Sequence, residues 1–198
     1  AYSTDIGNEV ASLGVQVHGG MGFVEETGAA QHMRDARIYA IYEGTNGIQA
    51  IDLVTRKIGI EGGALVAAEI ARMRGIVADV AKSNAVEFGL TAARLRETVD
   101  ALETATKHLL GALANDPANA QAGATPYTRL FGLALGGTAL AQKALKMRAN
   151  GVSDLARAEA TGLARFFAEN IATAATGLAE TVVTGGHAVV DLDIPLAS

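Results

Sequence analysis

The strongest constraint on the fold is the spacing of apolar residues in the second half of the chain. From position 64 onward they repeat in steps of four and three, which keeps them on one helix face and lets that face pack against other helices. One such run is Val66, Ile70, Met73, Val77 and Val80. The next is Leu95, Val99, Leu102, Thr106, Leu109 and Leu113, with a single polar break. We therefore expect two neighbouring helices of a bundle.

Two further helices complete the predicted bundle. The second helix should end near Pro117, because proline cannot continue a helix, and a loop should follow to about residue 125. A third helix is expected over 126–149, where Gly136 and Gly137 allow a neighbouring backbone to approach closely. Ser153 is a good N-cap for a fourth helix. We expect that helix to bury Leu163, Phe167, Ile171, Ala174 and Leu178.

The first 58 residues have a different texture, with more polar residues and glycines. We expect helices over 1–17, 27–38 and 44–58, with a glycine loop after the first. Three glycines within 59–63 indicate a linker. The predicted domains are therefore 1–58, a linker at 59–63, a helical extension at 64–186, and a tail at 187–198 whose end should be extended or disordered. The 40 alanines and 5% aromatics support an all-α fold in which the four later helices form an up-and-down bundle.

Charge and composition exclude several classes of function. The chain has 16 Lys plus Arg against 21 Asp plus Glu, a net charge of −5, so it offers no basic face for nucleic acid. It has no cysteine, which excludes disulfides, thiolate nucleophiles and cysteine zinc sites. This composition fits a reducing compartment, and we expect a cytoplasmic protein.

Membrane and metal signals are also missing from the sequence. The longest stretch without Asp, Glu, Lys or Arg, 10–24, contains His18 and four glycines and is too short to span a bilayer. The four histidines, at 18, 32, 108 and 187, have no metal-ligand spacing, so we expect no metal. The first residues resemble the middle of an amphipathic helix, and we expect the chain to begin inside a larger protein.

A glycine-rich segment, Gln16 to Phe23, is the first candidate site. It follows a predicted helix, whereas a dinucleotide fingerprint follows a strand, so a Rossmann site is excluded. Glycine backbone lets a ligand approach without interference from Cβ, and a cofactor pyrophosphate fits against Gly19 and Gly20. The alternative is a tight turn between helices, and the spacing leaves both interpretations open.

The second candidate is Ile41-Tyr42-Glu43-Gly44-Thr45-Asn46. It puts a carboxylate between apolar residues just before a helix, which Thr45 or Asn46 caps. Burial would raise the pKa of Glu43 and make it a useful base. The alternative is a solvated glutamate that favours the helix dipole. Just upstream, Arg34, Asp35 and Arg37 are close enough in sequence to form an ion-pair network.

Taken together, these motifs resemble a known family. Segments 16–23, 33–38 and 41–49 match, in order and separation, the C-terminal helical domain of the flavin-dependent acyl-CoA dehydrogenases. Residues 62–186 look like the extra helical domain that some bacterial members carry after that core. The resemblance implies that 1–58 holds the last helices of the dehydrogenase C-terminal bundle, followed by the four-helix extension.

The resemblance also implies roles for individual residues. Glu43 matches the base that removes the α-proton of an acyl-CoA thioester in the short- and medium-chain type, and its backbone N–H matches a donor to the thioester oxygen. Gly44 would lie beside the substrate. The cofactor would be FAD, with contacts implied for Gln16, Gly19, Gly20 and Thr45, the first three of them to the cofactor of a neighbouring subunit. Position 47 departs from the family pattern, because this chain has glycine there and some relatives have a longer polar residue.

Partners and alternatives follow from the same comparison. The family implies an acyl-CoA substrate, an electron-accepting flavoprotein and a homo-oligomer. The flavin platform and most of the substrate cleft of the family come from domains that would precede residue 1, so we expect the chain alone to be inactive. Two alternatives stay open: a non-catalytic helical assembly module, and an acyl-CoA oxidase with the same base.

Overall fold

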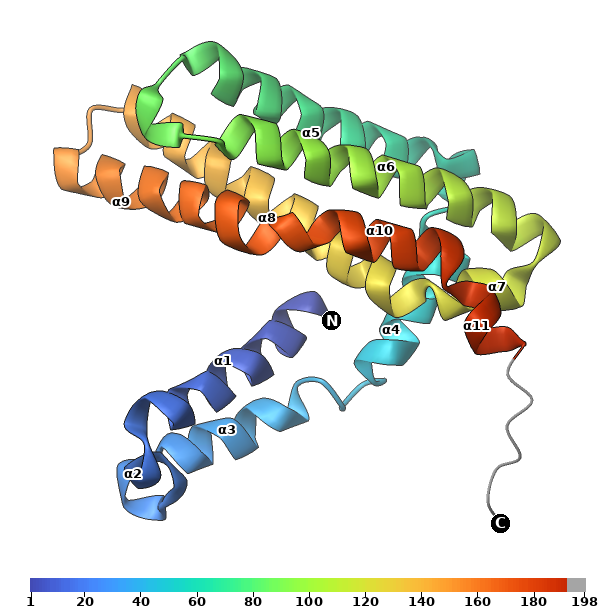
Figure 1. The fold of residues 1–198 in the computed structure, drawn as a ribbon, viewed down its shortest axis with the longest axis horizontal. Coiled ribbons are helices and arrows are strands. Elements are labelled where there is room, and N and C mark those ends of the chain that lie inside the picture. The colour runs from blue at the N-terminus through green and yellow to red at the C-terminus, as the bar shows by residue number, and fades with distance from the viewer. Residues whose placement is uncertain (192–198) are drawn as a thin grey trace.

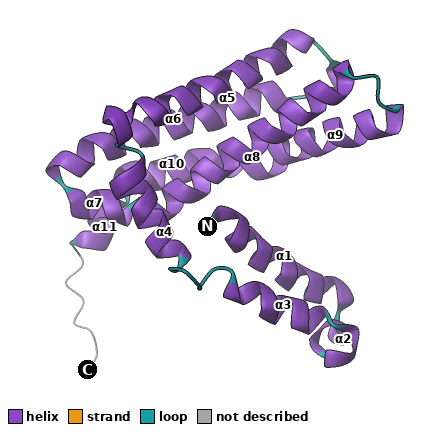
Figure 2. Cartoon of the chain, turned by 180° about the vertical axis from the view of Figure 1, so that it is seen from behind, coloured by secondary structure: helices purple, strands orange, loops and turns teal. Residues whose placement is uncertain are grey.

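The computed structural model describes residues 1–191, and within them the chain forms helices and turns without any strand (Figures 1 and 2). The α-helices are α1 (Tyr2–His18), α2 (Gly20–Phe23), α3 (Ala29–Ile38), α4 (Asn46–Asp52), α5 (Ala64–Ser83), α6 (Thr91–Asn115), α7 (Pro117–Ala122), α8 (Ala124–Ala149), α9 (Asp154–Phe166), α10 (Ala175–Thr184) and α11 (Gly186–Val190). The 3-10 turns are η1 (Glu25–Thr27), η3 (Ile60–Gly63), η4 (Val86–Phe88) and η6 (Ala172–Ala174), and the π-helical turns are η2 (Leu53–Lys57) and η5 (Phe167–Ile171). The predicted all-α fold is confirmed.

Four long rods form the bundle: α5, α6, α8, and the continuous line from α9 through α10 (Figure 1). The apolar faces expected on the first two helices are confirmed, because every residue of both runs is buried except Leu113, which is half-buried. Ion pairs from Arg74 of α5 to Asp100 and Glu103 of α6 join the outer surfaces of these two helices. The core therefore forms where large apolar side chains recur with helical spacing.

The face expected on the fourth helix is only partly correct, because Phe167 and Leu178 pack half-buried against the core while Ala174 is exposed. Leu163 is 50% exposed and Ile171 is 39% exposed. The buried residues are instead Ala160, Thr161, Ala164, Ala168, Ala172, Ala175, Ala179 and Val182. The π-helical turn η5 adds a residue to one turn and shifts the helix phase, while alanines let the helix axis lie close to α6 and α8.

Close packing also explains the adjacent glycines of α8. A Cβ on Gly137 would lie 2.5 Å from Leu95 Cδ2 and 3.2 Å from Phe167 Cε1, and a Cβ on Gly136 would lie 3.4 Å from Phe167 Cζ. Phe167 is half-buried over this pair. The expected approach of a neighbouring backbone is wrong, because the side chains of Leu95 and Phe167 occupy this space.

Short helices replace two of the predicted irregular segments. The predicted loop after Asn115 contains α7, whose N-cap Asp116 accepts a hydrogen bond from the Asn119 N–H at 3.2 Å. The predicted glycine loop contains the single turn α2. In the predicted tail, residues 187–190 are helical as part of α11, and 192–198 lie outside the described residues. Ser153 caps α9 as expected, accepting from the Ala156 N–H at 3.3 Å.

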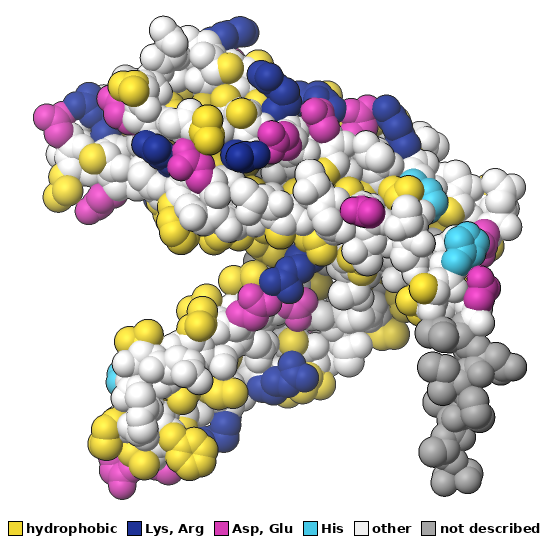
Figure 3. Space-filling model, in the orientation of Figure 1, with side chains coloured by type: hydrophobic (Ala, Val, Ile, Leu, Met, Phe, Trp, Pro, Cys, Tyr) yellow, Lys and Arg dark blue, Asp and Glu magenta, His cyan; other side chains and the backbone are white. Residues whose placement is uncertain are grey.

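The N-terminal helices form an arm that projects from the bundle. Helix α1 runs antiparallel to α3, α2 closes their far end, and a hollow separates this arm from the bundle (Figures 1 and 3). In contrast, α4 and η2 pack on α8, where Ala50, Val54 and Ile58 belong to the bundle core. Residues 46–58 therefore pack with the extension, and the predicted division into domains stays a prediction.

The arm carries many exposed apolar side chains, which border the hollow in Figure 3. Those between positions 1 and 48 are Val10, Leu13, Val17, Met21, Phe23, Met33, Ile38, Tyr39, Ile41, Tyr42 and Ile48. They are half of the large exposed hydrophobic residues of 1–191, within a quarter of its length. Of the helices in 1–191, none combines the length and apolar character needed to span a bilayer.

Candidate active site

The turn between α3 and α4 carries Glu43. Its backbone has φ of 56°, and the next residue, Gly44, has φ of 98°, so two consecutive residues adopt the left-handed region. For a residue with a side chain this conformation costs roughly 1–2 kcal/mol, and such positions are frequent at functional sites. The turn therefore holds Glu43 in a backbone conformation that is strained for a residue with a side chain.

Gln49 fixes this turn from the first turns of α4. Its Nε2 donates to the backbone carbonyl oxygen of Glu43 at 3.0 Å. A Cβ on Gly44 would lie 3.1 Å from the same Nε2, so a larger residue at position 44 would press on the donor. The Glu43 side chain is exposed, and among residues 1–191 no acceptor is recorded for its backbone N–H. Both groups are accessible to a ligand.

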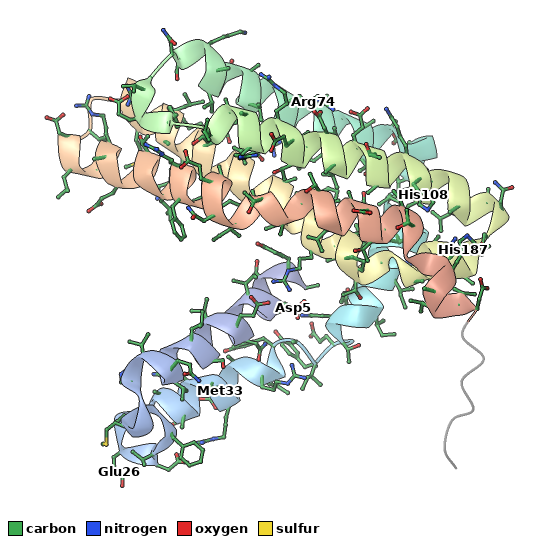
Figure 4. All side chains as sticks on the ribbon, viewed as in Figure 1. Asp5, Glu26, Met33, Arg74, His108 and His187 are labelled. Atoms are coloured by element: carbon green, nitrogen blue, oxygen red, sulfur yellow. The ribbon has the colours of Figure 1, made fainter. Side chains whose placement is uncertain are left out.

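Asn46 ties the same turn to the start of α1. Its Nδ2 donates to the Ala1 carbonyl oxygen at 3.0 Å, and it lies 2.8 Å from Thr4 Oγ1 and 2.6 Å from Asp5 Oδ1. Asp5 marks this end of the arm in Figure 4. Thr45 caps α4, with its hydroxyl oxygen 3.5 Å from the Ile48 N–H. The cap expected at Thr45 or Asn46 is thus made by Thr45, while Asn46 connects α4 to α1.

A second set of contacts joins α1 to the bundle. The Tyr2 ring fills the space beside Gly132 of α8, where any Cβ would overlap it. Glu9 of α1 pairs with Arg129 of α8 at 3.0 Å. Burial raises the pKa of the Tyr2 hydroxyl, and the nearby Arg129 guanidinium partly offsets this. The extension therefore holds α1 through Tyr2 and α4 through the core, and these two helices meet beside the Glu43 turn at Asn46.

The glycine segment lies at the other end of the arm from Glu43. Figure 4 shows Glu26 near this far end, and the ten-residue α3, about 15 Å long, separates the two places. A single chain therefore does not bring Gln16, Gly19 and Gly20 together with Glu43, Gly44 and Thr45.

The glycines of this segment differ in their surroundings. Gly19 has φ of 62°, and a Cβ on Gly19 or Gly20 would meet nothing within 4 Å. A Cβ on Gly22, by contrast, would overlap the Val15 carbonyl oxygen. Packing within the arm thus explains Gly22 but not the exposed backbone at 19 and 20. That open backbone, beside the exposed Gln16, fits the approach of a nucleotide cofactor.

Comparison with known proteins assigns the chain to a family. A model described as "Acyl-CoA dehydrogenase, C-terminal domain" matches residues 1–58. A second, "Acetyl-CoA dehydrogenase C-terminal like", matches residues 66–193, more than half of the chain. The chain belongs to the acyl-CoA dehydrogenase family. The resemblance seen in the motifs is therefore confirmed.

Three relatives within this family are informative. A 3-methylmercaptopropionyl-CoA dehydrogenase of Ruegeria pomeroyi is 42% identical over 173 residues, covering 87% of this chain and 28% of the relative. A butyryl-CoA dehydrogenase of Syntrophomonas wolfei is 43% identical over 63 residues, 32% of this chain and 10% of its own length. The caffeyl-CoA reductase-Etf complex subunit CarC of Acetobacterium woodii is 42% identical over 48 residues, which are 24% of this chain and 13% of that protein. This acyl-CoA dehydrogenase chain spans less than a third of these relatives.

In the described residues of this family member, the charged residues of 34–37 and the histidines do not form a further site. Arg34 pairs with Glu25 at 2.7 Å, and within 1–191 no ion pair joins Arg34, Asp35 and Arg37. The expected network is wrong because neighbouring helix positions face different directions. In the part of the chain that is described, no three His, Cys, Asp or Glu residues are grouped to hold a metal. His108 and His187 lie on separate helices, α6 and α11 (Figure 4).

Proposed function

We propose that this chain acts as the C-terminal part of an FAD-dependent acyl-CoA dehydrogenase, which removes hydrogen from the α- and β-carbons of an acyl-CoA thioester. The observation that carries this proposal is the left-handed turn at Glu43, with its free carboxylate and free backbone N–H. Family membership supplies the reaction class. The chain covers 28% of its Ruegeria relative, so the activity belongs to the longer protein.

In the proposed mechanism Glu43 takes the proton from the α-carbon. A base positioned within hydrogen-bond reach contributes about 10²- to 10⁴-fold in rate. The Glu43 backbone N–H donates to the thioester oxygen, where negative charge develops as the proton leaves. FAD, when bound, supplies the acceptor for the hydride that leaves the β-carbon. Gln49 holds the Glu43 carbonyl oxygen, which fixes the backbone on the C-terminal side of the base.

The base also needs shielding from water, because desolvation strengthens a carboxylate as a base. Within residues 1–191 the Glu43 side chain is exposed, and its neighbours Tyr39, Ile41 and Tyr42 are exposed as well. These apolar side chains suit a wall of a closed acyl pocket. We propose that the rest of that wall comes from the part of the longer protein that this chain does not cover.

The cofactor residues support an assembly of more than one copy. Thr45 lies beside Glu43 and would contact the flavin, whereas Gln16, Gly19 and Gly20 lie at the other end of the arm. One FAD therefore meets the Thr45 of one copy and the glycine segment of another. The exposed apolar surface of the arm supports the same homo-oligomer.

We further propose an electron-accepting flavoprotein as the redox partner and the cytoplasm as the location. The name of the Acetobacterium relative places that protein in a complex with Etf. The sequence given contains no cysteine, which supports a reducing compartment.

The test uses the longer protein that contains this chain, with the variant Glu43→Gln. We expect the variant to retain its yellow flavin, while bleaching of the flavin by acyl-CoA slows about 10²- to 10⁴-fold. The thioesters tested should include butyryl-CoA and 3-methylmercaptopropionyl-CoA, because relatives carry these names. Glu61→Gln is the matched control, because Glu61 is another exposed glutamate with a positive φ and lies outside the arm. An unchanged rate of flavin bleaching in Glu43→Gln would show that Glu43 is not the base. A colourless parent protein would show that FAD is not the cofactor.

A further inference from the structure

A cavity of about 560 Å³ lies at the end of the bundle opposite α4, and the proposed reaction does not use it. It is bounded by η4, the C-terminal end of α8 and one face of α9 along most of its length. Its charged and polar lining residues are Glu87, Arg148, Asp154, Arg157, Thr161 and Arg165. This volume falls within the range of small-molecule sites, roughly 300–1,000 Å³.

Three guanidinium groups surround the cavity from two helices. Arg157, Thr161 and Arg165 recur every four residues, so they form one row along α9. Arg148 approaches from the C-terminal end of α8, with its guanidinium carbon 5.9 Å from the centre of the Phe88 ring. Since the chain as a whole is negative, three arginines around one cavity are a local exception.

The acidic neighbours do not consume all the donors of these arginines. Arg157 pairs with Asp154, and Arg165 Nε lies 2.9 Å from Glu169 Oε1. The nearest nitrogen of Arg148 is 3.7 Å from Glu87, beyond hydrogen-bond distance. Each guanidinium carries several N–H donors in a planar fork, so donors remain for a ligand. Counting Glu169, three positive groups face three negative groups, so it is the remaining N–H donors rather than a net charge that would hold a ligand.

Thr161 gives a second reason to expect an occupant. Its residue is only 3% exposed, and its hydroxyl has no hydrogen-bond partner in residues 1–191. Buried polar groups in proteins are nearly always hydrogen-bonded, so an unpaired hydroxyl just behind the wall of the cavity calls for an explanation. It lies between the two arginines of the row, one helical turn from each.

We propose that this cavity binds the phosphate group of a small molecule. A phosphate presents three oxygens that accept from separate guanidinium forks at once, whereas a carboxylate presents two. The guanidinium groups come from α8 and from two different turns of α9, and this arrangement suits phosphate, which has more acceptor oxygens than a carboxylate. The cavity is larger than a single ion needs, so the natural ligand is a phosphate ester whose remaining part lies against Ala158 and Gly162. This proposal is independent of the Glu43 mechanism.

The test is an NMR titration of the full chain with inorganic phosphate as the probe, at constant ionic strength. We expect saturable shifts of backbone amide signals confined to residues around 148 and 157–165. Arg157→Gln should weaken this binding about tenfold or more. Arg72→Gln is the matched control, because Arg72 also forms an ion pair with an acid three residues before it, away from the cavity. It should leave the affinity unchanged.

Two more variants test how the charge of the cavity wall and the Thr161 hydroxyl affect phosphate binding. Glu87→Gln removes a negative group from the cavity wall and should tighten phosphate binding, which a merely structural effect would not do. Thr161→Val keeps the buried volume and should weaken binding without lowering the melting temperature. Shifts that do not saturate, or that are the same in Arg157→Gln as in the parent, would overturn the site. Acetate binding as tight as phosphate binding would overturn the choice of phosphate.

Discussion

The side-chain amide of Gln49 donates to the backbone carbonyl oxygen of Glu43 across the start of α4, at 3.0 Å. This bond spans six residues and closes a turn in which Glu43 and Gly44 are both left-handed. The carboxylate of Glu43 takes no part in it. Gln49 is therefore a positioning residue, which acts on the proposed base only through the backbone.

Replacing Gln49 with leucine should weaken the proposed catalysis without removing the base. A hydrogen bond of this kind contributes about 0.5–1.5 kcal/mol, which corresponds to a loss of about 2- to 13-fold in rate. We expect kcat in the longer protein to fall by that factor, with the flavin absorbance unchanged. Gln49→Glu, which keeps an acceptor but loses the donor, should not restore the rate. A full rate in Gln49→Leu would show that the turn holds without this bond.

The contact between Tyr2 and Gly132 predicts how the arm is held on the bundle. Gly132→Ala places a Cβ where the Tyr2 ring lies, and such overpacking costs about 1–3 kcal/mol. We expect amide hydrogen exchange in α1 to accelerate about tenfold, while α5 keeps its protection. Gly177→Ala on α10, where a Cβ meets nothing within 4 Å, is the control and should change neither. Unaltered exchange in α1 would mean that other contacts hold the arm.

The sequence predicts α5 and α6 well because large apolar side chains recur there with helical spacing. The same reasoning fails for the helix from Asp154 to Thr184, where the buried residues are mostly alanines. Alanine is common on both faces of a helix, so its position carries little signal. The π-helical turn at Phe167–Ile171 also changes the phase, and no single residue type marks such a turn.

The candidate site also contains residues that the sequence indicates and residues that only the fold brings together. Sequence motifs lead to Glu43 and the glycines, because a carboxylate before a helix and a glycine cluster stand out locally. They do not lead to Asn46 or Gln49 as parts of a network. Asn46 meets residues that lie more than 40 positions earlier, which only the fold brings together. The sequence signal at Asn46 is a polar side chain at a helix start, which predicts a cap.

The Gly137 contact predicts the stability of the bundle. In Gly137→Ala the new methyl group would press on Leu95 and Phe167, and we expect a loss of about 1–3 kcal/mol in the free energy of unfolding. Gly111→Ala on α6, where a Cβ meets nothing within 4 Å, should instead stabilise the chain by up to about 1 kcal/mol through helix propensity. Urea unfolding followed by circular dichroism measures both. Equal stability of the two variants would contradict the packing at Gly137.

Tyr127 predicts a loss of stability in alkali. This ring is fully buried, and its hydroxyl lies 2.8 Å from the hydroxyl of Thr106. Burial raises the pKa of Tyr127 from 10.0 to about 12, and the hydrogen bond with Thr106 only partly offsets this. The folded chain thus retains the proton where the unfolded chain loses it. The stabilisation is fully present below pH 10 and is lost as the pH rises towards 12.

The measurement compares the parent chain with Tyr127→Phe by urea unfolding between pH 9 and 12. A shift of about two pKa units corresponds to about 3 kcal/mol, and that is the upper size of the extra loss expected in the parent. Thr106 also bonds the Leu102 carbonyl oxygen at 2.7 Å, so its hydroxyl keeps a partner in the variant. Other groups titrate equally in both proteins, so the difference between their slopes belongs to Tyr127. Parallel slopes would show that this phenol does not resist ionisation, and the tight core around α6 and α8 would then admit water.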